Sequence, residues 1–281
     1  MAMMTRKGHG LGAFASTPNP NYLGFPSHLI VRTGEFPVRA FITGALGPTK
    51  DQGNQGSCTG HGSTSQGERL YRKFKGQSPI FAPAFHYYIE RKIEKTLGQG
   101  DCGAQVATSL QVAQNGANGF CLESLMPYNA ADYSTAPTPQ ALASALQNPG
   151  GSWHSIGNDI ANIKSCILSD YSAVIGISVY DSFEDDAVET SGLIPLPNLG
   201  VESLQGGHET HALIGFDDEI KCPNANPGAV LVQNSWGPSW GIAPPEPSLS
   251  KSRGFAWISY SYLMDPNLTS DCRMQHLGKS W

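Results

Sequence analysis

Apolar residues recur at helical spacing in the first half of the chain and form short continuous runs in the second half. Leu70 and Phe74 are an i, i+4 pair within a helix expected over residues 58–75. Two further helices are expected over residues 81–96 and 105–113. Because strands follow the helices, we predict an α+β fold in which a helical lobe packs against a sheet lobe. The predicted strands are residues 173–180, 212–216, 229–233 and 254–260.

The N-terminal residues 1–34 lack such a pattern and are rich in Gly, Pro, Ser and Asn. We therefore predict an extended arm followed by one domain over residues 35–281. Its helical lobe would span about residues 50–150 and its β lobe about residues 151–275. Such an arm is ordered only if something holds it, either its own domain or neighbouring subunits of a larger assembly.

Composition narrows the function classes. The 281 residues can form a large core, and 40% hydrophobic with 15% charged residues is typical of a globular protein. A net charge of -5 gives no electrostatic case for nucleic acid or an anionic membrane as partner. The arm lacks the apolar run of a signal peptide, so a cytoplasmic location is the default expectation and association with a virion the alternative. No cofactor is expected, and the six cysteines favour buried free thiols.

A candidate nucleophile stands at the start of the first predicted helix. Cys58 ends the string QGNQGSC, residues 52–58. The unpaired N–H groups at a helix N-terminus favour a thiolate. Gln52 carries a side-chain amide suited to donate to a developing oxyanion, together with the Cys58 backbone N–H. His61, one turn after Cys58, is expected to serve packing or to lie on the surface.

A second string, NSWGPSWG at residues 234–241, completes a resemblance to the papain-like (C1) cysteine peptidases. The order and separation of the two strings resemble that family, and the Gly-Ser-Cys-Thr variant at 56–59 resembles its bacterial and viral branch. The resemblance implies a two-lobe fold with the active site in the cleft between the lobes. It also implies that Asn234 accepts the Nδ1–H of the catalytic histidine and that Trp236 shields this bond.

Two histidines compete for the role of base. His208 needs one extra residue before Gly215 to match the family, which a β-bulge could absorb. His211 instead needs the hairpin shifted by two residues. Both stay candidates, with His208 preferred because the Gly-Gly-His at residues 206–208 matches without adjustment. No third ligand is evident that would turn these histidines and Glu209 into a metal site.

The groove segment resembles the family at Gly103 and Ala104, which would hydrogen-bond the substrate backbone like an added strand. Trp236 is a further substrate-binding candidate, and the family disulfide is absent because Gln55 replaces one of its cysteines. The resemblance implies a thiol endopeptidase that acts on peptides or proteins. The alternative is a papain-like fold used as a structural component of an assembly such as a phage virion, with or without residual activity. A blocked cleft would favour that alternative, and the arm could block it.

Overall fold

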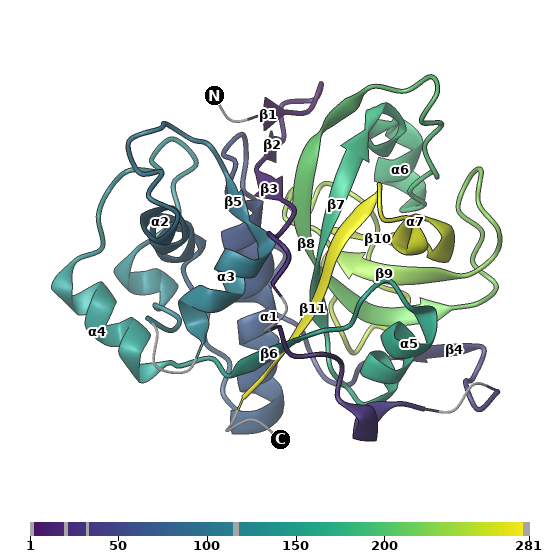
Figure 1. The fold of residues 1–281 in the computed structure, drawn as a ribbon, viewed down its shortest axis with the longest axis horizontal. Helices are drawn as coiled ribbons and strands as arrows, with labels where there is room; N and C mark the ends of the chain where they lie inside the picture. The colour runs from purple at the N-terminus through teal and green to yellow at the C-terminus, as the bar shows by residue number, and fades with distance from the viewer. Residues whose placement is uncertain (1–2, 20–21, 32–33, 115–117, 278–281) are drawn as a thin grey trace.

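The computed structural model describes residues 3–19, 22–31, 34–114 and 118–277. It contains two lobes with the N-terminal arm running between them (Figure 1). The helical lobe lies to the left in that view, and the sheet lobe lies to the right. This confirms the predicted α+β class, a papain-like arrangement of N-terminal helices and a C-terminal antiparallel sheet. The helical lobe contains α1 (Cys58–Lys75), α2 (Pro83–Ile93), α3 (Val106–Ala113), α4 (Pro139–Gln147) and the 3-10 helix η2 (Glu123–Leu125).

The helix α1 has the bounds that the sequence predicts, and it ends where Gly76 adopts a left-handed conformation with φ 62°. Its first four turns are buried, because α2, α3 and the sheet surround it. The other two predicted helices are also present, as α2 and α3, each a little shorter than expected. The central helix therefore carries Cys58 on its first turn into the junction of the two lobes.

The sheet lobe is built on seven strands in the order β10-β9-β8-β7-β11-β6, with β4 added to β8. All neighbouring strands in it are antiparallel. The runs at 173–180 and 229–233 are strands at the predicted residues, whereas the strand predicted at 212–216 begins earlier, at Leu204. The strands are β4 (Arg39–Phe41), β6 (Ser152–Ser155), β7 (Ala173–Tyr180), β8 (Leu204–Asp217), β9 (Ala229–Gln233), β10 (Phe255–Ser259) and β11 (Thr269–His276).

Short helices cover the sheet lobe, and its inner residues form the main hydrophobic core. All six cysteines are free, and five of them are buried. Among the described residues, no helix is long and apolar enough to span a membrane. The helices are α5 (Ile160–Leu168), α6 (Asp186–Ser191), α7 (Tyr260–Met264) and the 3-10 helices η1 (Ser27–Leu29) and η3 (Asp181–Glu184).

The arm is ordered by its own domain, one of the two possibilities that the sequence leaves open. It contributes β1 (Met3–Met4), β2 (Gly10–Leu11) and β3 (Ala13–Phe14). The first two pair with each other antiparallel, and β3 pairs in parallel with β5 (Ala104–Gln105) of the helical lobe. Figure 1 shows these three strands in line between the lobes, directly over the N-terminal end of α1.

Candidate active site

Cys58 lies at the N-terminus of α1 and has no exposed surface. Burial raises the pKa of the Cys58 thiol to about 12, although backbone hydrogen bonds from Glu209 and Gly12 lower it in part. The sequence led us to expect a stabilised thiolate at this helix terminus. The difference arises because the arm excludes water from the thiol, and loss of hydration outweighs the helix dipole. In this closed arrangement Cys58 is a neutral thiol.

His208 lies on β8 and meets Asn234, which follows β9. The imidazole Nε2 is 2.6 Å from Asn234 Oδ1. The same Oδ1 accepts the backbone N–H of Ser235 at 2.8 Å, which identifies it as the amide oxygen and so makes Nε2 the donor. The expectation that Asn234 accepts from Nδ1 is therefore wrong. With the proton on Nε2, the neutral ring leaves Nδ1, buried and without a partner, as its basic nitrogen.

The environment of His208 keeps it neutral. Burial lowers the pKa of His208 to about 4, and the hydrogen bond with Asn234 only partly opposes this shift. The Trp236 ring packs against the imidazole with centroids 5.0 Å apart, and only 2% of Trp236 is exposed. Trp236 thus covers the bond between His208 and Asn234, as the sequence predicts. In this structure the Cys58 thiol and the His208 imidazole are therefore both neutral.

The rival histidine lies on the other face of the strand. Because side chains alternate along a strand, two residues three positions apart point to opposite sides. His211 Nε2 contacts Ser172 Oγ at 2.8 Å and its Nδ1 contacts Gln233 Oε1 at 3.2 Å. The pairing of β8 with β9 does shift register between His211 and Gly215, but a step of four residues along β8 is matched by a step of two along β9, so the irregularity absorbs two residues rather than the one expected. The structure therefore brings His208 to Asn234 and leaves His211 in the core.

Gln52 is oriented by three hydrogen bonds. Its Oε1 accepts from Ser235 Oγ at 2.6 Å, so its amide nitrogen points the other way. That Nε2 donates to the carbonyl of Gln55 at 2.8 Å and to the carbonyl of Gly10, in the arm, at 3.0 Å. A side-chain amide held in this way is preorganised to donate to an oxyanion. His61 is buried rather than exposed, with Nδ1 2.9 Å from the Ser57 carbonyl, and serves packing.

The arm fills the cleft as extended backbone. Gly10 N donates to Gly53 O at 2.9 Å, and Gly12 N donates to Gly207 O at 3.1 Å. The N–H of Ala104 donates to Gly12 O at 2.8 Å, so one of the two predicted groove residues makes a strand-like bond. Its neighbour Gly103 provides space instead, because a Cβ there would overlap the same carbonyl.

Charged side chains hold the start of the arm on the β lobe. Lys7 Nζ lies 2.5 Å from Asp186 Oδ1 and 2.6 Å from Glu189 Oε1, and both contacts raise the pKa of Lys7. Between this ion pair and Gly10, the ring of His9 stacks on Trp236 with centroids 4.4 Å apart and planes 3° apart. Trp236 therefore contacts the arm, the occupant of the cleft in this structure. Sequence reasoning missed His9, since nothing local marks it as a partner of Trp236.

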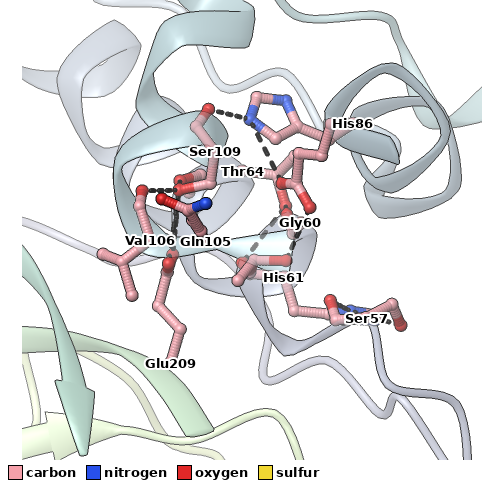
Figure 2. A network of polar contacts seen from close by, with 12 residues as sticks. Ser57, Gly60, His61, Thr64, His86, Gln105, Val106, Ser109 and Glu209 are labelled. Carbon is pink, nitrogen blue, oxygen red and sulfur yellow. Dashed lines mark hydrogen bonds and ion pairs between the residues drawn. The ribbon is translucent and has the colours of Figure 1, made fainter. Parts of the chain in front are cut away.

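A buried polar network connects β8 to α1 and α3 (Figure 2). It links Glu209 of β8 to Ser63 on α1 and to Ser109 on α3. His86 Nε2 extends the network through the Ser109 carbonyl at 2.6 Å. Sequence reasoning considered Glu209 only as a metal ligand. Among the described residues, no group of three or more His, Cys, Asp or Glu could hold a metal ion.

Comparison with known proteins places these features in a context. No protein-family model matches the chain. It is 28% identical over 249 residues to an uncharacterized peptidase C1-like protein of Acanthamoeba polyphaga mimivirus, covering 85% of this chain and 73% of that protein. The fold matches xylellain, a cysteine protease from Xylella fastidiosa, with a TM-score of 0.77 and 26% identity over 98% of this chain and 99% of that one. Digestive procathepsin L 3 of Tenebrio molitor matches with a TM-score of 0.63 and 16% identity over 90% of this chain and 76% of that one.

Proposed function

Since the chain belongs to the papain-like cysteine peptidases, we propose that it hydrolyses peptide bonds with Cys58 as nucleophile and His208 as base. The bond from His208 Nε2 to Asn234 Oδ1 carries this assignment, because it leaves Nδ1 to take the thiol proton. The thiolate of Cys58 then adds to the substrate carbonyl carbon. His208 returns the proton to the leaving amine, and water hydrolyses the thioester in a second step.

Gln52 and the groove supply the rest of the machinery. As the carbonyl oxygen becomes an oxyanion, it accepts hydrogen bonds from Gln52 Nε2 and from the Cys58 backbone N–H. The orientation of Gln52 by Ser235 supports this role. The substrate backbone would add a strand at Ala104, whose N–H now binds the arm. Protein or peptide substrates therefore compete directly with the arm.

The arm acts as an inhibitor in this proposal. It occupies the oxyanion donor of Gln52 and the groove at Ala104 at the same time. It also buries Cys58, whose thiol then has a raised pKa. Turnover requires the arm to leave, so that water returns to the cleft and the ion pair of Cys58 and His208 can form.

A blocked cleft also fits the second candidate function, a structural component of a larger assembly. The completed His208–Asn234–Trp236 arrangement favours the peptidase, because a purely structural protein has no need for an oriented imidazole with a free Nδ1. The arm binds the cleft of its own domain in the structure, so an assembly partner is not needed to order it.

The test uses a thiol-directed peptidyl probe and a protein substrate such as casein. Full-length protein, Cys58→Ser and an arm variant, Gly12→Val, are compared at mildly acidic pH. We expect Cys58 to be labelled faster than a free thiol once the arm is displaced, and casein cleavage to be lost in Cys58→Ser. Labelling of Gly12→Val at no more than the rate of a free thiol would favour the structural function.

A further inference from the structure

The arm marks the two ends of the cleft. At one end the carbonyl of Gly12 accepts the N–H of Ala104, and at the other end the ring of His9 stacks on Trp236. Between them, the carbonyl of Gly10 accepts the side-chain amide that we propose as oxyanion donor. A peptide that lies along the cleft with its reacting carbonyl at this donor therefore extends towards Ala104 on one side and over Trp236 on the other.

The leaving side of the cleft is the side of Trp236. In the proposed reaction His208 returns its proton to the leaving amine, so that amine must lie beside the imidazole. The Trp236 ring packs against the same imidazole, with centroids 5.0 Å apart. Residues that follow the scissile bond therefore pass over Trp236, whereas the acyl part of the substrate lies at Ala104.

The wall beyond Trp236 is acidic. Residues 181–189, which form η3 and α6, include five Asp or Glu and contain no Lys or Arg. Within the described part of the chain, the ion pairs of these acidic side chains are formed with Arg6 and Lys7 of the arm. Four of the acidic side chains contact the arm and together form what we call the acidic platform: Asp181, Glu184, Asp186 and Glu189.

The arm shows how the platform binds a cationic peptide. Lys7 Nζ lies 2.5 Å from Asp186 Oδ1 and 2.6 Å from Glu189 Oε1. The carboxylate of Glu184, only 3% exposed, accepts the backbone N–H of Arg6 at 2.7 Å and that of Lys7 at 3.2 Å. Hydrogen bonds to a charged acceptor are stronger than those between neutral groups. The platform therefore holds both the backbone and the positive charges of an extended segment.

A substrate that displaces the arm removes both cationic partners of the platform. Its carboxylates then face the leaving side of the cleft beside Trp236, where a hollow of about 280 Å³ has room for side chains. Lys7 lies three residues from Gly10 along the arm, so a cation at the second or third residue after the scissile bond would reach the same carboxylates. A Glu or a free C-terminal carboxylate at that place would be repelled.

We propose that the acidic platform is a specificity site on the leaving side, which selects peptides with Lys or Arg as the second or third residue after the scissile bond. This inference rests on the proposed peptidase activity. The platform also favours cleavage within a chain over cleavage next to a C-terminus, whose carboxylate it would repel. It contacts the substrate away from the reacting atoms, so it changes KM more than kcat.

The first test uses internally quenched peptides whose cleavage site has been mapped by mass spectrometry. They differ only in the second and third residues after the scissile bond, which are both Lys, both Gln or both Glu. We expect Gly12→Val, in which the arm is displaced, to prefer the Lys peptide to the Glu peptide by about tenfold in kcat/KM, a reasonable sum for two exposed ion pairs. Equal kcat/KM for the three peptides would overturn the proposal.

The same measurement on Gly12→Val with Asp186→Asn and Glu189→Gln assigns the preference to the platform. These two side chains are 95% and 36% exposed, so the substitutions should leave the melting temperature unchanged. The preference for Lys should fall to about twofold or less, and in Gly12→Val itself it should shrink at about 0.5 M salt because exposed charges are screened. A preference that survives both changes would overturn the proposal.

The second test requires no hydrolysis. Fluorescence anisotropy measures binding of the same three peptides to Gly12→Val that also carries Cys58→Ala. The Lys peptide should bind about tenfold more tightly than the Glu peptide, and the absence of any difference, whether the peptides bind alike or not at all, would overturn the proposal. Selective binding without cleavage by the Cys58 protein would support the platform and contradict the peptidase activity. Cleavage without selectivity would do the reverse.

Glu35→Gln combined with Glu219→Gln, in the Gly12→Val background, is the control in both tests. It removes the same charge as the platform variant, at two exposed positions outside the platform. The preference for the Lys peptide should be retained, because it depends on short-range pairing rather than on net charge. Its loss in this control would mean that net charge attracts the peptides, and would overturn the proposal.

Discussion

At the scale of single residues, the two histidines of β8 have different hydrogen-bond partners. His208 binds Asn234 and keeps Nδ1 free, whereas both nitrogens of His211 are occupied. We predict that His208→Ala lowers kcat/KM by about 10²–10⁴, the usual contribution of a general base. His211→Ala should instead lower the free energy of unfolding by about 1–3 kcal/mol, because it leaves buried polar partners unsatisfied.

Peptide hydrolysis and urea unfolding, measured on both variants in the Gly12→Val background, separate these effects. The assignment of His208 is wrong if His211→Ala abolishes activity at unchanged affinity while His208→Ala retains it. Loss of activity in both variants with unchanged stability would equally contradict the division of roles.

The sequence identifies some of these residues and cannot identify others, for physical reasons. Cys58, Gln52 and Asn234 stand in short strings that resemble those of the papain-like peptidases, so the strings alone are enough to propose them as site residues. The choice of His208 required the register shift beyond His211, which depends on pairing with β9 and is not encoded locally. Glu209 escaped notice because its partners lie on α1 and α3, far away in the sequence.

At the scale of elements, the arm is a strand with one face made of glycine. Gly10 and Gly12 alternate with His9 and Leu11, so both glycines point to the same side. A Cβ at Gly10 would overlap the Gln55 carbonyl, and one at Gly12 would overlap the Gly56 carbonyl. The arm can lie on the nucleophile loop only because these two positions have no side chain.

We predict that Gly12→Val expels the arm and increases the rate of Cys58 labelling by at least about tenfold. That factor corresponds to the loss of about 1.4 kcal/mol, roughly one net hydrogen bond. Gly24→Ala is the matched control, because it lies in the same arm with nothing within 4 Å of the added Cβ. Equal labelling of wild type, Gly12→Val and Gly24→Ala would mean that the arm does not limit access to the cleft.

Helices and strands could be predicted where the pattern of their own residues is enough to specify them. The buried runs at 173–180 and 229–233 and the helix at 58–75 match because local apolar pattern and a stop at Gly76 suffice. β6 and β11 carry more polar residues, such as His154 and Arg273, and become strands through pairing with each other and, for β11, with β7. The arm strands have two residues each and exist only because the cleft is there to receive them.

At the scale of the whole molecule, the fold buries several titratable groups in their neutral forms. Burial lowers the pKa of His61 to about 3 and those of His86, His208 and His211 to about 4. Burial also raises the pKa values of Glu90 and Glu209 well above 4.5. Folding therefore changes the number of bound protons, and stability must depend on pH.

The buried histidines and the buried glutamates change the stability of the fold in opposite directions as the pH changes. Below pH 6.5 the unfolded chain protonates four histidines that the folded protein keeps neutral, which destabilises the fold as pH falls towards 4. Above pH 4.5 the unfolded chain ionises two glutamates that the folded protein keeps protonated, so their stabilisation is lost as pH rises. Between these values the four fully buried histidines outnumber the two fully buried glutamates, and this set alone leaves a surplus of about two protons with the unfolded state.

We therefore predict that the free energy of unfolding falls by roughly 3 kcal/mol per pH unit on acidification through that window, at about 1.4 kcal/mol for each proton. Urea unfolding at a series of pH values measures this slope. His86→Gln tests its origin, because the glutamine amide can still donate to the Ser109 carbonyl but cannot take up a proton on unfolding. The slope measured for this variant should be smaller by about 1.4 kcal/mol per pH unit, the contribution of one proton. An unchanged slope, or a protein that becomes more stable towards acid, would mean that the buried histidines do not control stability, and the neutral resting state of His208 would lose its support.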